Sequence, residues 1–289
     1  MRRRLWMVAS ICGIWLVLGA LGPTAEASNF NPPKHFYLAL GDSVAFGAQL
    51  GKFFQELSTG TYDPATFNTG YVDDFSARLR TLNPEIDTVN MSCPGETTES
   101  FTRQCVFHSV LGFALHTNYS SSQEAAAVSF LRGHPGQVSP ITITLGLNDA
   151  LLPCAGPTFL VDVSCVHTTM PAVLQTAPQN LSKIIGDLQE ASPSSEIIVM
   201  TYYNAFFVED PSTDALISAL NDEIASVAAA RDARVADAFK PFNRDANEYA
   251  TICALTLMCP NRDYHPSDAG YGVIAQQFWT ASSYGRLTD

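Results

Sequence analysis

Short apolar runs that alternate with amphipathic helical patterns constrain the fold of this 289-residue chain more than any other feature. Strands are expected at residues 36–40, 85–90, 141–145 and 196–201 and around Val235. Helices are expected at residues 71–82, 123–132, 172–191 and 213–231 and from Ser267 onward. Strands that alternate with helices indicate βαβ units. The pattern therefore predicts a three-layer α/β/α domain with a mostly parallel sheet of about five strands.

Three long segments lack such a pattern and are expected to be irregular: residues 44–69, 101–122 and 243–260. The first follows a predicted strand and is rich in aromatic residues: Phe46, Phe53, Phe54, Tyr62 and Phe67. These rings suit either a wall for an apolar substrate or a loop that covers the core, and the sequence leaves both roles open. No repeat or change of composition divides residues 28–289, so we expect one domain there.

Residues 1–27 are typical of a secretory signal peptide. Arg2, Arg3 and Arg4 form a basic start, residues 5–21 are apolar, and Ala25-Glu26-Ala27 is a small-residue cleavage pattern. The alternative is a membrane anchor, because the apolar run is nearly long enough to cross a bilayer. Cleavage after Ala27 is preferred, since the cleavage pattern follows at the expected distance. We therefore expect a secreted protein without stable membrane insertion after cleavage.

Cysteine usage fits the same compartment. Of seven cysteines, Cys12 would leave with the signal peptide, and six remain as three pairs of near neighbours: Cys93/Cys105, Cys154/Cys165 and Cys253/Cys259. Six cysteines allow fifteen connectivities. Nearest-neighbour disulfides are preferred because each closes one short loop. No pair has C-x-x-C spacing, so neither a zinc site nor a thioredoxin-like redox motif is supported.

The charge of the chain argues against two classes of partner. The whole chain has a formal net charge of −12, and residues 1–27 carry three arginines and one glutamate, which leaves −14 on the predicted domain. An acidic surface disfavours nucleic acid and anionic membranes as partners. We expect a monomer that binds neither.

Polar residues follow three of the predicted strands at the point where each strand ends. They are Asp42-Ser43, then the turn from Ser92 to Gly95, then Asn148-Asp149. The carboxyl ends of parallel strands share one edge of a sheet, where ligands bind in open α/β folds. A fourth polar point, Asp263-Tyr264-His265-Pro266, comes just before the last predicted helix. Four such points in these places predict a common site.

The residue types at this site suit acyl transfer. A serine hydroxyl is a poor nucleophile at neutral pH and needs a base within hydrogen-bond reach, a task for which an imidazole is suited. We therefore expect Ser43 as nucleophile and His265 as base. The developing oxyanion needs fixed N–H donors, and Gly95 N–H, the Asn148 amide and Ser43 N–H can supply them. The alternative for Gly41-Asp42-Ser43 is an ordinary turn with a helix cap and no catalytic role.

Four blocks of the sequence resemble those of the SGNH, or GDSL, hydrolase family, in the family's order and over nearly the whole predicted domain. They are Gly41-Asp-Ser43, Gly95 within Asn90-Met-Ser-Cys-Pro-Gly95-Glu, Gly146-Leu-Asn148-Asp and Asp263-Tyr-His265-Pro. The resemblance implies a flavodoxin-like α/β/α fold and a serine esterase. It also implies Ser43 as nucleophile, His265 as base, and Ser43, Gly95 and Asn148 as the oxyanion hole.

One block departs from the family pattern, which is usually D-x-x-H. Here Arg262 lies three residues before His265, and Asp263 lies two before it. The preferred partner of the imidazole is the Asp263 carboxylate, because an ionised acceptor makes the stronger hydrogen bond. The alternative is a backbone carbonyl such as that of Arg262. Asp42 and Asp149 are expected to hold turn backbones rather than to react.

The sequence thus predicts a secreted serine esterase or lipase that hydrolyses lipid or acyl esters through an acyl-enzyme on Ser43, without metal or organic cofactor. A carbohydrate acetylesterase or phospholipase of the same fold is an alternative, and a catalytically silent secreted binding module is another. A two-metal phosphatase is disfavoured because its ligand motifs are missing, and the chain has no G-x-S-x-G of an α/β-hydrolase.

Overall fold

A five-stranded parallel sheet forms the centre of the computed structural model, which describes residues 30–244 and 246–288. Its strands are β1 (Phe36–Gly41), β2 (Asp87–Asn90), β3 (Val138–Thr144), β4 (Ile197–Thr201) and β5 (Arg234–Asp237). The strand order is β2-β1-β3-β4-β5, and every neighbouring pair is parallel. This confirms the predicted sheet. The expected signal peptide and Cys12 lie outside the described residues.

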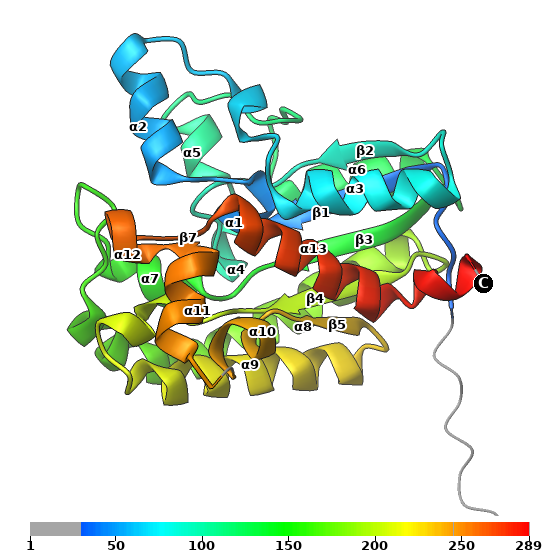
Figure 1. Cartoon of the computed structure of the whole chain (residues 1–289). Helices are drawn as coiled ribbons and strands as arrows, with labels where there is room; N and C mark the ends of the chain where they lie inside the picture. Colours follow the sequence, from blue (N-terminus) through cyan, green and yellow to red (C-terminus); the bar gives the residue numbers. More distant parts are fainter. Residues whose placement is uncertain (1–29, 245, 289) are drawn as a thin grey trace, which may run out of the picture.

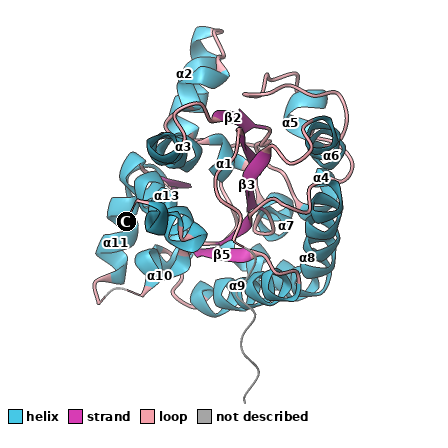
Figure 2. Cartoon of the chain, turned by 90° about the vertical axis from the view of Figure 1, so that its right-hand side faces the viewer, coloured by secondary structure: helices cyan, strands magenta, loops and turns pink. Residues whose placement is uncertain are grey.

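Helices cover both faces of the sheet, which gives the predicted three layers (Figure 1). On one face, α3 (Tyr71–Leu82) packs against α13 (Asp268–Ser282). The other face carries α6 (Gln123–Gly133), α8 (Val163–Ala191) and α9 (Thr213–Ala230). Figure 2 shows the strands between these two groups of helices. Because both faces are covered, all seven residues of β3 are buried, the serine and threonines included.

Residues 44–69, expected to be irregular, contain three short helices instead. They are α1 (Ser43–Phe46), α2 (Leu50–Thr59) and the 3₁₀-helix η1 (Pro64–Phe67). In α2, Leu50, Phe53, Phe54 and Leu57 have the i, i+3, i+4, i+7 spacing of an amphipathic helix. Two of these helices end in a glycine C-cap: Gly47 after α1, with a φ of 80°, and Gly60 after α2, with a φ of 67°.

Two further expectations about local structure were wrong. Helix α8 begins at Val163 rather than Ala172, because Asp162 caps it and accepts hydrogen bonds from the N–H groups of Ser164 and Cys165. Residues 243–260 are largely helical rather than irregular. They contain the end of α10 (Phe239–Asn243), then α11 (Glu248–Leu255), and they reach into α12 (Met258–Asn261).

A small second sheet lies beside these helices. In it, β6 (Thr256–Leu257) pairs antiparallel with β7 (Asp263–Pro266). The remaining short elements are α4 (Thr98–Phe101), α5 (Val106–Ser109), α7 (Asn148–Leu151), η2 (Leu152–Cys154), η3 (Ala205–Val208) and η4 (Tyr284–Leu287).

Three disulfides join the cysteines as nearest neighbours: Cys93–Cys105, Cys154–Cys165 and Cys253–Cys259. The first two brace segments that lie beyond the carboxyl edge of the sheet. Within the described residues, no helix has the length and apolar character needed to cross a membrane.

Candidate active site

The turn after β1 presents Ser43 at the carboxyl edge of the sheet, as the first residue of α1. Asp42 caps this helix: its carboxylate accepts hydrogen bonds from Val44 N–H at 2.9 Å, Thr144 Oγ1 at 2.9 Å and the Tyr202 hydroxyl at 2.6 Å. Burial raises the pKa of Asp42 to about 6 although these hydrogen bonds act in the opposite direction. Asp42 therefore holds the turn, as expected, rather than facing a substrate.

Gly41 is required where this turn begins. Its φ is 126°, and a Cβ atom there would lie 2.2 Å from the carbonyl oxygen of Thr144 in the neighbouring strand β3. A larger residue would push β1 from β3 and displace Ser43. Each residue of Gly-Asp-Ser thus has its own role: Gly41 allows the close strand contact, Asp42 caps the helix, and Ser43 lines the cavity.

Strand β7 places Asp263 and His265 on the same face, because residues i and i+2 of an extended strand point the same way. The Nδ1 atom of His265 lies 2.6 Å from Oδ1 of Asp263. The same carboxylate accepts hydrogen bonds from His265 N–H at 3.0 Å and from Leu50 N–H at 2.7 Å. Burial alone would raise the pKa of Asp263, but the charge of His265 and these hydrogen bonds outweigh it and leave that pKa below its usual value.

Asp263 lies two residues before His265 rather than three, and the extended strand still brings its carboxylate to the imidazole. The hydrogen-bond partner of Nδ1 is the Asp263 carboxylate and not the carbonyl of Arg262, whose side chain pairs with Glu209 at 2.7 Å. The other ring nitrogen of His265, Nε2, is buried and has no hydrogen-bond partner in the described part of the chain. It is therefore not bonded to Ser43 in this structure, although both residues line one cavity.

Gly95 and Asn148 line the same cavity, on the turns after β2 and β3. Gly95 has a φ of 78°, a left-handed conformation that leaves its backbone open toward the cavity. The Asn148 side-chain amide donates one hydrogen bond, at 3.0 Å, to the carbonyl oxygen of Glu96. An amide NH₂ carries two hydrogens, so this bond orients Asn148 and leaves it one further donor.

The cavity has a volume of about 450 Å³, and most of its lining is apolar. Ser43, Gly95, Asn148 and His265 are all among the lining residues. Of the aromatic residues between 44 and 69, Phe46, Phe53 and Phe54 line the cavity. Tyr62 and Phe67 do not line it and pack in a hydrophobic cluster that also contains Phe46 and Phe53. Phe46 and Phe53 therefore take both of the roles that the sequence left open, wall of the cavity and cover of the core.

Glu96 and Gln123 belong to the site, and sequence reasoning missed both. Gln123 donates through Nε2 to the Glu96 carboxylate at 2.9 Å. It also bonds both backbone groups of Gly41, at 2.6 Å to the N–H and 3.0 Å to the carbonyl. Burial raises the pKa of Glu96 to about 7. These contacts join the turn that holds Gly95 to the turn that holds Ser43. The only signal for Glu96 is a carboxyl group directly after Gly95; nothing marks Gln123.

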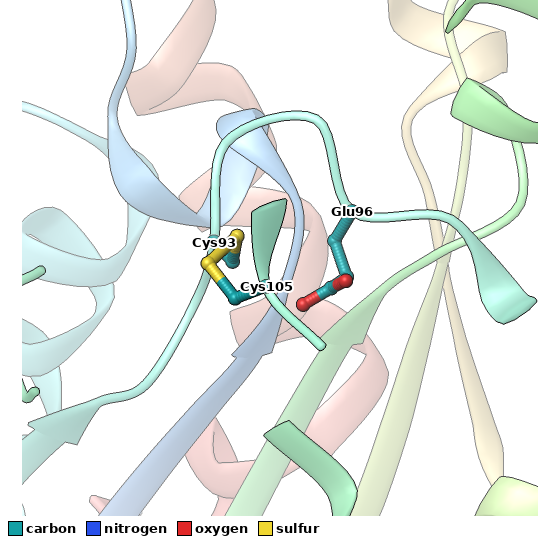
Figure 3. A group of neighbouring side chains, drawn as sticks. All are labelled: Cys93, Glu96 and Cys105. Atoms are coloured by element: carbon teal, nitrogen blue, oxygen red, sulfur yellow. A yellow bond between two sulfur atoms is a disulfide. The ribbon is translucent and has the colours of Figure 1, made fainter. Parts of the chain in front are cut away.

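Figure 3 shows Glu96 beside Cys93 and Cys105, a group with metal-ligand residue types. The two sulfur atoms are bonded to each other, and a disulfide sulfur is a far poorer metal ligand than a thiolate. The group is left with one carboxylate as a strong ligand. It therefore serves as a brace for this turn.

Comparison with known proteins shows to which family the chain belongs. Residues 39–273 match the sequence pattern of the GDSL-like lipase/acylhydrolase family. The chain has no significant match among curated proteins. The crystal structure of phospholipase A1 from Streptomyces albidoflavus is 18% identical, with 86% of this chain and 99% of that chain covered and a TM-score of 0.56.

Two further structures show the same likeness of fold. The extracellular lipase from Streptomyces rimosus is 18% identical over 85% of this chain and 99% of its own, with a TM-score of 0.55. An acetylxylan esterase from Geobacillus stearothermophilus is 17% identical over 88% and 96%, with a TM-score of 0.53. Since the family pattern spans most of the chain, this protein belongs to the GDSL-like lipase/acylhydrolase family and is a carboxylic ester hydrolase.

Proposed function

We propose that the protein hydrolyses esters through a covalent acyl-enzyme on Ser43. The observation that carries this proposal is the orientation of His265: Nδ1 is held by Asp263, and the unpartnered Nε2 belongs to a residue of the cavity that Ser43 lines. A base held in this way is suited to take the proton of a neighbouring hydroxyl. In the absence of substrate, such catalytic hydrogen bonds are often long, and they tighten when substrate binds.

In the first half of the reaction, His265 Nε2 takes the Ser43 proton while Oγ attacks the ester carbonyl carbon. The oxyanion so formed accepts hydrogen bonds from Ser43 N–H, Gly95 N–H and the free donor of Asn148. Collapse of this intermediate breaks the ester bond, and His265 returns the proton to the departing alcohol. Water, deprotonated by His265, then attacks the acyl carbon, and the acid leaves Ser43 with its hydroxyl restored. The Asp263 carboxylate stabilises the imidazolium in both halves.

The preferred substrate class is a lipid or other acyl ester. An apolar cavity of about 450 Å³ next to Ser43 suits an acyl chain, because burial of its methylenes is favourable by about 0.8 kcal/mol each. An acetylated sugar would place hydroxyl groups against this apolar wall.

We further propose that residues 1–27 direct secretion and are removed, and that residues 28–289 form the mature single domain. Three disulfides support an oxidising compartment. The mature N-terminus, read by sequencing, should be Ser28.

Hydrolysis of p-nitrophenyl esters of two to eighteen carbons by the mature protein tests the reaction and the substrate class. Ser43→Ala and His265→Ala should each lower kcat by several orders of magnitude, and Asn148→Ala by about 10²–10³-fold. Ser58→Ala, on the exposed part of α2, and His134→Ala are matched controls that should retain activity. Turnover no faster than that of Ser43→Ala would instead support a silent binding module. Faster release of acetate from acetylxylan than of longer acids would reject the lipid substrate.

A further inference from the structure

Exposed apolar side chains gather around the mouth of the catalytic cavity. Ten large hydrophobic residues of the described chain are exposed, and six of them also line the cavity. These six, here called the apolar rim, are Phe54, Leu57, Val106, Leu111, Leu152 and Phe159. Two more, Val110 and Leu160, are exposed and are next in sequence to the rim residues Leu111 and Phe159, without lining the cavity. Only Tyr249 and Leu287 lie elsewhere.

The rim is assembled from segments that are distant in sequence. Phe54 and Leu57 belong to α2, which stands away from the sheet on the same side of the molecule as α5 (Figure 1). Phe159 lies in the loop closed by the Cys154–Cys165 disulfide, and its ring is 6.3 Å from that of Phe54. Val106 begins α5, next to Cys105 of the first disulfide. Separate elements, two of them held by covalent links, thus present apolar side chains to water at one place.

Leaving such side chains exposed has a cost, since full burial of a Phe, Leu or Val is worth about 1.5–3 kcal/mol. Contiguous exposed apolar surface on a soluble protein marks an interaction site. The occupant must cover the rim and still allow substrate to reach Ser43. A protein partner or a second copy of the chain would close the cavity, whereas a surface made of ester lipid would cover the rim and supply substrate through it.

The charge of the chain restricts the kind of lipid surface to which the apolar rim can bind. The six rim residues are uncharged, and the chain has 16 basic against 28 acidic residues. An anionic lipid surface would repel this protein, while a neutral or zwitterionic one would not. On the basis of the ester hydrolysis proposed above, we propose that the apolar rim adsorbs to the surface of electrically neutral aggregated ester lipid, with the cavity mouth against that surface.

Binding to phosphatidylcholine vesicles, measured by flotation of the mature Ser43→Ala protein, separates adsorption from hydrolysis. Val110→Asn combined with Leu160→Gln should lower the partition coefficient by roughly tenfold or more, because two apolar side chains no longer enter the lipid. The matched control combines Tyr249→Asn with Leu287→Gln, the two exposed apolar residues away from the rim, and should bind like the parent. In the active protein, the first pair should leave kcat/KM on a dissolved short ester unchanged, because neither residue lines the cavity.

Several outcomes would overturn adsorption: no binding to the neutral vesicles, equal losses in both double variants, or stronger binding to phosphatidylglycerol vesicles. A dimer that dissociates on Val110→Asn/Leu160→Gln would reassign the rim to a second copy of the chain. Failure of the proposed function gives a different result, namely vesicle binding by a protein that hydrolyses no ester. Equal thermal melting of all variants excludes misfolding as the cause of a loss.

Discussion

Asp263 reaches His265 across two residues instead of three because β7 is extended. Its carboxylate is 99% buried, yet it stays the acceptor of three hydrogen bonds, two of them from His265 itself. A buried carboxylate with such partners favours its charged form, which is the form that can stabilise an imidazolium. Despite the unusual spacing, the Asp263 carboxylate therefore suits the role that we propose for it.

We expect Asp263→Asn to lower kcat by about 10²–10⁴-fold with little change in KM, because an amide of similar shape fixes the wrong tautomer and supplies no charge. Steady-state kinetics on a dissolved p-nitrophenyl ester measures both constants. Asp87→Asn, at an exposed position of β2, is the control. Near-normal kcat in Asp263→Asn would show that the ring is positioned by something other than this carboxylate.

The residues of the site differ in how far the sequence reveals them. Ser43, Gly95, Asn148 and His265 each follow a strand or precede a helix, and the structure brings all four to one cavity. Glu96 acts through Gln123, which lies 27 residues further along the chain in a helix with no distinctive pattern. Such a contact is made only by tertiary packing, so no local pattern predicts it.

At the scale of elements, periodicity predicts what is long and regular. The helix expected at 71–82 is α3, and strands at 141–145 and 196–201 correspond to β3 and β4 within a few residues. The helices within residues 44–69 were not predicted because two of them, α1 and η1, have four residues each, and α1 and α2 end in glycine, which is also common in loops. The start of α8 differs from the expected Ala172 because Pro171 lies inside the helix, and proline is usually found at a helix start or end.

The Cys93–Cys105 disulfide ties the turn that holds Gly95 to the start of α5, which carries part of the cavity wall. Replacing both cysteines by serine should lower the free energy of unfolding by about 2–3 kcal/mol, as for other loops of this length. It should also raise KM for a twelve-carbon ester more than for a four-carbon ester, because Val106 and Phe107 lose their anchor. Urea unfolding and kinetics on the two esters measure these effects.

The matched control is Cys253→Ser with Cys259→Ser, which opens a shorter loop of which no residue lines the cavity. Its chain-length preference should equal that of the parent protein. A similar shift in both variants would mean that the disulfides act on global stability alone.

At the scale of the whole molecule, we expect the free energy of unfolding to fall as the pH rises from about 4.5 to 7. Burial raises the pKa of Asp42 to about 6 and of Glu96 to about 7, so in this range these two carboxyl groups bind more protons in the folded protein than in the unfolded chain. His116 acts in the opposite direction, because burial lowers its pKa. Below this range the direction reverses for Asp263, whose pKa is lowered. For Glu96 alone the loss is on the order of 3 kcal/mol, at 1.36 kcal/mol per pKa unit.

Urea unfolding between pH 4 and 8 measures this slope. Glu96→Gln removes one titrating group while keeping an acceptor for Gln123, so its stability should decline less over the same range. Identical slopes in the two proteins would show that the Glu96 carboxyl does not titrate in this window.

The overall architecture is the part that the sequence predicts best, because alternation of strands and helices is repeated along the whole domain and the family pattern covers residues 39–273. The shape of the cavity is the part it predicts least. That shape depends on how α2, α5 and the 154–165 loop meet, and these contacts join residues far apart in the chain.

One hydrogen bond described above joins a helix of the cavity wall to the proposed Asp263–His265 pair. The first N–H of α2, that of Leu50, donates to the same Asp263 carboxylate whose other oxygen steers the imidazole. A substitution that tilts α2 to admit a bulkier acyl group would also move the Asp263 carboxylate, and we expect it to lower kcat. A change of acyl-chain preference that keeps the reaction rate is therefore expected to come mainly from substitutions in the 154–165 loop, which can change without disturbing the Asp263–His265 pair.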